Sequence, residues 1–246
     1  MRHAWVGFVF VLFAQAQEEK KDDPKRVMVD AAQALRQTSK GNSFTFVGTL
    51  KTEANPDDAD SEATKCKVSG GVGSPFYAVF KVKSETSSHE IVFKGGKLAG
   101  RLTWKGHPLE LGNAPSEILS LVNFARLAIY VDSATSAKSL RDERIGDGDC
   151  RVFELVLPKE TIRSQNEDAE AAEEEQKSVQ GVDLRLCVQK SDGLVVKLEA
   201  TVRRLYKDDD HPDDATKGVS SYSLTLKEIG TAKVAIPPGL EKMFKD

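Results

Sequence analysis

The residues that could act as acid–base catalysts or metal ligands are few and widely separated. The chain has four histidines, His3, His89, His107 and His211, and no two of them are spaced as metal-binding pairs usually are. A Gly-x-Ser-x-Gly nucleophile elbow is absent from the sequence. The glycines fall in expected hairpin turns, and no glycine-rich run precedes a helix as in a phosphate-binding loop. The sequence therefore favours a protein without catalytic residues, metal or cofactor.

Acidic residues are numerous, but they form no recognisable site. The chain has 38 Asp and Glu against 35 Lys and Arg, so its formal net charge is −3. The segment Asp208–Asp214 gathers several carboxylates, yet it lacks the glycine and the final glutamate of an EF-hand loop. We expect a solvated loop there and another at Asp57–Asp60. An acidic chain is also a poor nucleic-acid binder, because phosphate contacts need clustered Lys and Arg.

Three cysteines, Cys66, Cys150 and Cys187, allow one disulfide bond. Cys150 and Cys187 belong to two predicted strands in which apolar residues alternate with polar ones, and both cysteines lie on the polar face. An antiparallel register with Cys150 opposite Cys187 places Phe153 opposite Leu184, so apolar side chains face each other. This register predicts a Cys150–Cys187 bond with Cys66 free. The alternative is two free thiols on neighbouring strands.

The first 16 residues have the order of a secretory signal peptide. Met1-Arg2-His3 is basic, Ala4 to Phe13 is apolar, and Ala14-Gln15-Ala16 is a small-x-small cleavage site. The apolar run is shorter than the roughly 20 residues that span a bilayer. We expect residues 1–16 to be removed and residues 17–246 to form one soluble domain, which is periplasmic or secreted.

Two amphipathic segments are predicted to be helices. The first begins at Pro24 and ends near Lys40, before Gly41-Asn42. The second begins at Pro115 and is apolar over more than one stripe. It is therefore expected to be buried on more than one side or to cover a cavity.

The rest of the chain alternates polar and apolar residues, which predicts two sets of antiparallel strands. Lys94-Gly95-Gly96-Lys97 predicts a tight hairpin in the first set. Two acidic insertions, residues 161–178 and 207–218, interrupt the second set, and the first of them is predicted to be a solvated helix or a disordered loop. A short closing edge is expected at Val234–Pro238. The predicted strands are Phe44–Leu50, Thr64–Val68, Phe76–Lys83, Glu90–Lys94, Lys97–Trp104, Ser139–Ile145, Cys150–Leu157, Val182–Gln189, Leu194–Tyr206 and Val219–Ile229.

This order of elements resembles the lipoprotein-localisation superfamily, with its LolA, LppX-like and RseB-like members. The matching stretches are Ala31 to Phe46, Glu143 to Val152, Ser191 to Glu199, and Ile236-Pro237-Pro238-Gly239. The resemblance implies an α+β fold, in which helices cover the concave mouth of a strongly curved antiparallel half-barrel sheet. In that family the cavity accepts acyl chains, and the function is carriage or sensing without catalysis. The two acidic insertions depart from the compact carrier.

The resemblance also implies that inward-facing apolar side chains contact the ligand, with ordinary core packing as the alternative for each. Two functions stay open. One is an envelope carrier or sensor that binds a lipid or an acylated protein. The other is a module with a filled core that docks an envelope protein, and a secreted enzyme is a weaker third possibility. A monomer is expected. The candidate ligand-binding residues are Phe44, Phe46, Phe76, Phe80, Phe93, Leu102, Ile118, Leu121, Val122 and Ala125.

Overall fold

The structure is a computed structural model of the chain, and it describes residues 22–41, 43–53, 63–85, 87–103, 114–164, 169–207 and 215–244. The predicted signal peptide and the two predicted solvated loops, Asp57–Asp60 and Asp208–Asp214, lie outside these ranges. No helix among the described residues is long and apolar enough to cross a membrane.

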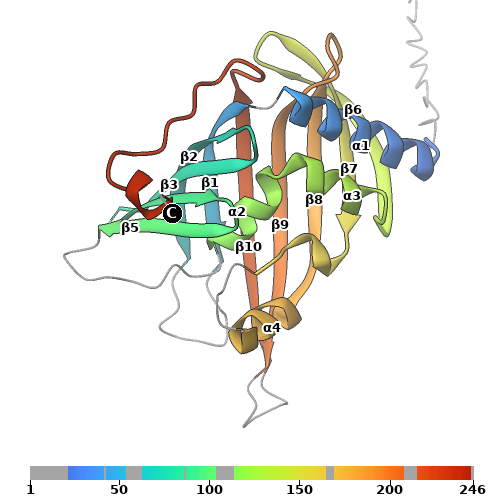
Figure 1. Cartoon of the computed structure of the whole chain (residues 1–246). Coiled ribbons are helices and arrows are strands. Elements are labelled where there is room, and N and C mark those ends of the chain that lie inside the picture. The colour runs from blue at the N-terminus through green and yellow to red at the C-terminus, as the bar shows by residue number, and fades with distance from the viewer. Residues whose placement is uncertain are drawn as a thin grey trace, which may run out of the picture.

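One antiparallel sheet of ten strands forms the body of the molecule (Figure 1). The strand order is β5-β4-β3-β2-β1-β10-β9-β8-β7-β6, so two meanders of five strands each join through the β1–β10 pair. The sheet is strongly curved and its edges β5 and β6 do not pair, as expected of a half-barrel. The strands are β1 (Phe44–Thr52), β2 (Thr64–Gly73), β3 (Tyr77–Lys83), β4 (Ser88–Lys94), β5 (Lys97–Thr103), β6 (Ser136–Ile145), β7 (Gly148–Leu157), β8 (Val179–Gln189), β9 (Val195–Lys207) and β10 (Ala215–Lys227).

Three helices cover one face of this sheet, which we call the inner face; the opposite one is the outer face (Figure 1). They are α1 (Pro24–Lys40), α2 (Ala114–Val122) and α3 (Phe124–Val131). Asp23 caps α1 by accepting a hydrogen bond from the Lys25 amide, and Pro24 occupies the first turn. The main core lies between these helices and the alternate strand residues that point inward.

One buried and one exposed hydrogen bond fix α1 to the sheet. The Thr38 hydroxyl donates to the Ala34 carbonyl at 2.8 Å and accepts from the Val195 amide at 2.9 Å. The Gln37 amide nitrogen donates to the Asp192 carbonyl at the β8–β9 turn. The carboxyl half of α1 is therefore tied to the start of β9 and does not rest on the sheet by apolar contact alone.

The second predicted helix is divided into α2 and α3 at Asn123. The Asn123 side chain accepts a hydrogen bond from the Arg126 amide at 3.2 Å, so it caps α3 and ends α2. A 3₁₀ turn, η1 (Lys159–Thr161), leads into the first acidic insertion. The insertion contains the helix α4 (Ala169–Ser178), which contacts β8 and β9.

The C-terminal segment (229–244) differs from the expected closing strand. It is extended without pairing as a strand and ends in the 3₁₀ turn η2 (Glu241–Phe244). The Tyr77 hydroxyl donates to the Val234 carbonyl at 2.7 Å, and Arg101 Nη2 donates to the Pro238 carbonyl at 2.8 Å. A Cβ at Gly71 would lie 2.6 Å from Val234, so glycine permits this approach. The segment therefore lies against the outer face of the first meander, and Figure 1 shows it in red near β2–β5.

Candidate functional site

A pocket of about 350 Å³ opens where the carboxyl end of α1 meets the sheet and the α2–α3 break. We call it the mouth pocket. Its volume lies at the lower end of the range for small-ligand sites. The break at Asn123 brings the end of α2 and the start of α3 to the same wall. The lining residues are Ser39, Lys40, Phe44, Val72, Gly73, Ser74, Phe76, Val122, Asn123, Phe124 and Ala125.

Aromatic side chains organise the mouth pocket and the core beside it. The rings of Phe44 on β1 and Phe124 on α3 are stacked, with centroids 5.0 Å apart and planes 12° from parallel. The ring centroids of Phe44 and Phe46 are 6.4 Å apart, and those of Phe76 and Phe93 are 5.9 Å apart. Aromatic pairs of this kind stabilise the fold by about 0.5–1.5 kcal/mol beyond the effect of burying their apolar area. The pocket thus has rigid aromatic and aliphatic walls, whereas Lys40, Ser39 and Asn123 supply polar groups.

The ten predicted ligand-binding residues separate into three groups. Phe44, Phe76, Val122 and Ala125 line the mouth pocket, and Phe93 lies behind Phe76. The side chain of Leu102 lies outside the described part of the chain. The other four are at most 1% exposed and belong to the main core: Phe46, Phe80, Ile118 and Leu121.

Phe124 and Val72 line the mouth pocket but were absent from the predicted set. Phe124 follows Asn123, which is a good N-cap residue, so an interruption of the helix could have been found from the sequence. Val72 follows Gly70-Gly71, which is typical of a turn, whereas the structure extends β2 to Gly73. At Gly70 a Cβ would lie 2.6 Å from Phe80 and 2.7 Å from Phe46, so this strand glycine makes room for two core aromatics.

A buried ionic cluster lies on the inner face beneath α2 and α4. Arg204 Nε on β9 donates to Glu117 Oε1 on α2 at 2.8 Å, with both side chains at most 3% exposed. Arg204 Nη1 donates to Ser178 Oγ at 2.9 Å, and its Nη2 lies 3.8 Å from Glu175 Oε1 on α4. The Tyr222 hydroxyl donates to Glu117 Oε2. The cluster therefore joins two helices to β9 and β10.

Burial dominates the protonation of this cluster. Desolvation raises the pKa of Glu117 above its ordinary value, although Arg204 and the hydrogen bond from Tyr222 act in the opposite direction. The pKa of Tyr222 is also raised, by complete burial and by the neighbouring Glu117 carboxylate. Neither Glu117 nor Tyr222 lines the mouth pocket. We therefore interpret the cluster as a structural link between the helices and the sheet.

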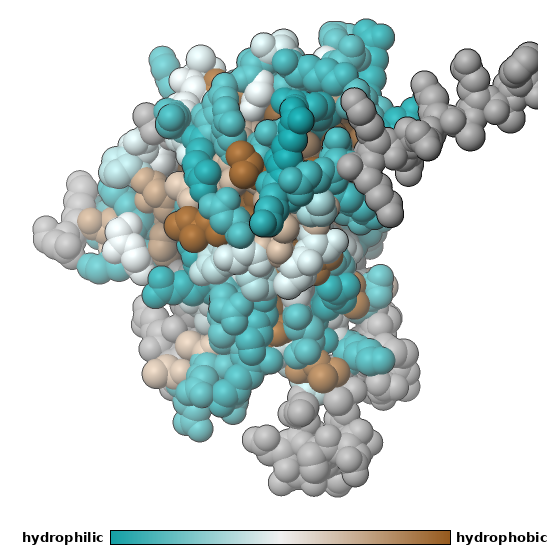
Figure 2. All heavy atoms as spheres, turned by 90° about the vertical axis from the view of Figure 1, so that its right-hand side faces the viewer, coloured by the Kyte–Doolittle hydropathy of each residue, from teal (hydrophilic) through white to brown (hydrophobic). Residues whose placement is uncertain are grey.

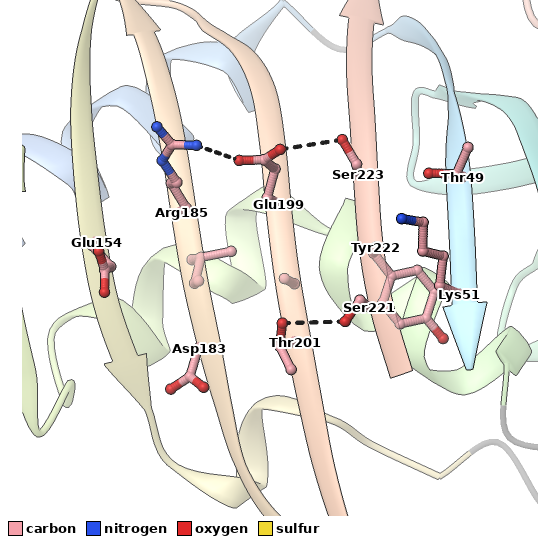
Figure 3. Close-up of a pocket in the computed structure, with 12 residues that line it drawn as sticks. Thr49, Lys51, Glu154, Asp183, Arg185, Glu199, Thr201, Ser221, Tyr222 and Ser223 are labelled. Carbon is pink, nitrogen blue, oxygen red and sulfur yellow. Dashed lines mark hydrogen bonds and ion pairs between the residues drawn. The ribbon is translucent and has the colours of Figure 1, made fainter. Parts of the chain in front are cut away.

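A second hollow, of about 500 Å³, lies on the outer face across β1 and β7–β10 (Figure 3). Its walls are mainly hydroxyl groups and charged side chains. Arg185 Nη1 donates to Glu199 Oε2 at 2.7 Å, and Thr201 and Ser221 are hydrogen-bonded to each other. Hydrogen bonds from Lys197 and Arg185 lower the pKa of Glu199 despite its partial burial. Arg185 thus pairs with Glu199 and Thr201 with Ser221, whereas Lys51 on the same wall has no ion pair with a described residue. Among the described residues, no histidine or cysteine lines the hollow to act as a base or nucleophile.

The predicted disulfide bond is absent, and the register expected for it is wrong. In the structure Cys150 pairs with Gln189 and Cys187 with Val152, so β8 is displaced by two residues from the expected pairing. Both cysteines do lie on the outer face, as their alternation indicated, and they share a small apolar cluster with Val152. All three thiols are free, and burial raises the pKa of Cys187 to about 11.

No group of three or more His, Cys, Asp and Glu side chains could hold a metal ion within the described ranges. His89 is half-buried on β4, and burial lowers its pKa. The other histidines, His3, His107 and His211, lie outside those ranges. Seen from the side of α1 and β6, the surface is mainly hydrophilic with small hydrophobic areas between (Figure 2). No catalytic constellation is formed by the residues that the structure describes.

No protein-family model matches the chain, and no curated protein matches it. Solved structures do match. The lipoprotein LppX of Mycobacterium tuberculosis is 13% identical, with 85% of this chain and 98% of that chain covered and a TM-score of 0.47. For LprF of Mycobacterium bovis the identity is 14%, the coverage 85% and 96%, and the TM-score 0.40. A LolA-superfamily protein of Nitrosomonas europaea is 14% identical, with coverage of 91% and 98% and a TM-score of 0.24. At these identities the likenesses concern the fold alone.

Proposed function

We propose that this protein is an exported, non-catalytic carrier or sensor that binds the acyl chain of a lipid or lipidated protein in the mouth pocket. The observation that supports this function is the lining of that pocket, where Phe44, Phe76 and Phe124 join Val72 and Val122 around an open volume of about 350 Å³. Transfer of hydrocarbon from water into such a site is favourable by about 0.8 kcal/mol per buried methylene.

The polar groups of the pocket suggest where the head of the ligand would lie. Lys40 and Ser39 end α1, and Asn123 and Ser74 complete the set. An amphiphile with an anionic or hydrogen-bonding head could therefore place its chain against the phenylalanines and its head beside Lys40.

A docking module with a filled core is the second candidate, and a specific observation favours it. Phe46, Phe80, Ile118 and Leu121 are at most 1% exposed, so the concave space beneath the helices is occupied by the protein itself. On this reading the mouth pocket is a surface hollow without a lipid.

A substitution at Ala125 separates these two functions. Ala125 is exposed and lines the pocket, so Ala125→Trp should fill the pocket without disturbing the core. We expect wild-type protein to bind a fluorescent fatty acid, and Ala125→Trp to reduce this binding at least tenfold with an unchanged melting temperature. Ile129→Trp is the matched control, because Ile129 is 63% exposed one turn further along α3 and is not in the pocket lining.

Solvent extraction of purified protein, followed by mass spectrometry, should detect co-purified acyl chains. Absence of acyl chains together with no binding of the fluorescent probe would exclude the carrier function and leave the docking module. Export is tested separately by N-terminal sequencing of secreted material, which should begin at Gln17. An intact Met1 on folded protein would contradict export.

A further inference from the structure

The outer face of β1–β3 carries five exposed lysines, which we call the lysine face. They are Lys51 on β1, Lys65 and Lys67 on β2, and Lys81 and Lys83 on β3. The register places Lys51 directly opposite Lys65, and Lys67 directly opposite Lys83. Lys51 is seen in Figure 3 on β1, beside the outer-face side chains of β10.

On the other half of the outer face, basic residues form ion pairs with carboxylates. On β6–β9, Lys138 pairs with Glu154 at 3.2 Å, Arg203 with Asp183 at 2.8 Å, and Arg185 with Glu199 at 2.7 Å. These alternating signs are what cross-strand neighbours usually show, because opposite charges stabilise and like charges destabilise a directly opposed pair. The second meander thus neutralises its charges internally.

The lysine face has no such neutralisation. No carboxylate among the described residues lies within ion-pair distance of any of the five lysines. Glu90 on β4 is opposite Lys81, but it is also opposite Arg101 on β5. The chain as a whole has a net charge of −3, so a general excess of basic residues does not explain the patch.

The shape and chemistry of the lysine face suit an extended anionic surface. A shallow hollow of about 310 Å³ lies between Lys67, Lys81 and Lys83, with Val47 42% exposed at its floor. Lysines act as mobile point charges, whereas recognition of a single carboxylate or phosphate usually employs the planar fork of arginine. The strands β1–β3 are interior strands of the sheet, so their backbone groups are already paired and no peptide can be added as a strand.

We propose that the lysine face docks the protein on a bilayer that contains anionic phospholipids. Each lysine near such a surface strengthens binding by about fivefold, and the attraction falls off within a Debye length of about 10 Å at 0.1 M salt. The surface is separate from the mouth pocket, which opens on the inner side of the sheet. This docking therefore does not depend on lipid being bound in the pocket.

Cosedimentation of the mature chain with lipid vesicles tests this proposal. We expect binding to vesicles of phosphatidylcholine with phosphatidylglycerol at low salt, loss of that binding at about 0.5 M salt, and no binding to phosphatidylcholine alone. Lys67→Gln/Lys81→Gln/Lys83→Gln should weaken the binding on the order of 100-fold. The melting temperature of this triple variant should not fall, because the substitutions remove repulsion between like charges.

The matched control is Lys138→Gln/Lys190→Gln/Arg203→Gln. It removes the same number of positive charges, each of which is paired with a carboxylate, Lys190 with Asp142 at 2.5 Å. This control should retain nearly all vesicle binding, and so should Ala125→Trp. Equal weakening by the two triple variants would overturn the proposal, because it would show an effect of net charge only. Binding of poly-glutamate in preference to the anionic vesicles would also overturn it, in favour of an acidic polypeptide partner.

Discussion

Replacement of Arg204 by methionine tests how far the buried ionic cluster holds α2 and α4 on the sheet. Methionine keeps a long unbranched side chain but removes the guanidinium that contacts Glu117 and Ser178. Glu117 is 1% exposed and would then be a buried carboxyl group whose remaining hydrogen-bond partners are the neutral hydroxyls of Tyr222 and Ser220. Removal of one member of a buried ion pair usually destabilises by about 3–5 kcal/mol. We expect Arg204→Met to lower the free energy of unfolding by that amount.

The double variant Glu117→Leu/Arg204→Met distinguishes a buried charge from a general packing defect. It removes both charges, so no uncompensated ion is left, and apolar replacements of such pairs are often neutral or stabilising. We expect it to be more stable than Arg204→Met alone by about 2 kcal/mol or more. Urea unfolding followed by far-UV circular dichroism measures both differences. The reasoning would be refuted if Arg204→Met lost less than about 1 kcal/mol of stability. It would also be refuted if the effect of the double variant equalled the sum of the effects of Glu117→Leu and Arg204→Met measured singly.

The raised pKa of Glu117 also predicts a pH dependence of definite sign. The folded chain binds the Glu117 proton more tightly than the unfolded chain does. The resulting stabilisation is complete below the ordinary glutamate pKa of about 4.3 and is lost as the pH rises through the folded-state value. We expect the stability of the wild type, compared with Glu117→Gln, to decrease as the pH rises from about 4.3. A difference that increases with pH in this window would show that Arg204 outweighs burial.

Three further outcomes follow from close contacts elsewhere in the sheet. A Cβ at Gly48 would lie 1.9 Å from a carbonyl oxygen of β10, so Gly48→Ala should destabilise the chain by about 1–3 kcal/mol in thermal unfolding; an unchanged melting temperature would contradict the β1–β10 register. Tyr77→Phe removes the hydrogen bond to the Val234 carbonyl, so limited proteolysis should remove the C-terminal segment faster, with a stability loss of about 1 kcal/mol. At pH 8 a thiol reagent should modify the partly exposed Cys66 before the buried Cys187, whose pKa is about 11; resistance of Cys187 after unfolding without reductant would indicate a disulfide bond.

Local sequence patterns predicted most elements because each signal and its consequence lie close together in the chain. Pro24 to Lys40 forms one helix, since apolar spacing, Pro24 and Gly41 agree on its extent. The alternation of apolar residues likewise predicted which face each strand buries. The division at Asn123 was missed because the apolar residues continue through it, and only a cap hydrogen bond separates α2 from α3.

Register and long-range pairing could not be obtained in the same way. Alternation repeats every two residues, so it places Cys150 and Cys187 on the correct face but does not distinguish registers that differ by two. A tight turn would have selected one register, but β7 and β8 are connected by the long segment that contains α4. The β1–β10 pair has no local signal at all, since Phe46 and Leu226 are opposite each other although most of the chain separates them. The contact of Val234 with Gly71 and Tyr77 on the outer face likewise joins segments far apart in the sequence.

The predicted ligand-binding residues were chosen for facing inward, and the structure shows why that criterion is too broad. A half-barrel of this size needs its own apolar filling, and Phe46, Phe80, Ile118 and Leu121 supply it. Among the described residues, the mouth pocket opens where this filling ends, between α1 and the α2–α3 break. On the α2 side the pocket is bounded by Val122, and the same helix carries Glu117, which is held by Arg204 and Tyr222. On the proposed function, a ligand that extends the pocket toward α2 would have to break these buried contacts, so the stability of α2 would limit the ligand size that the carrier accepts.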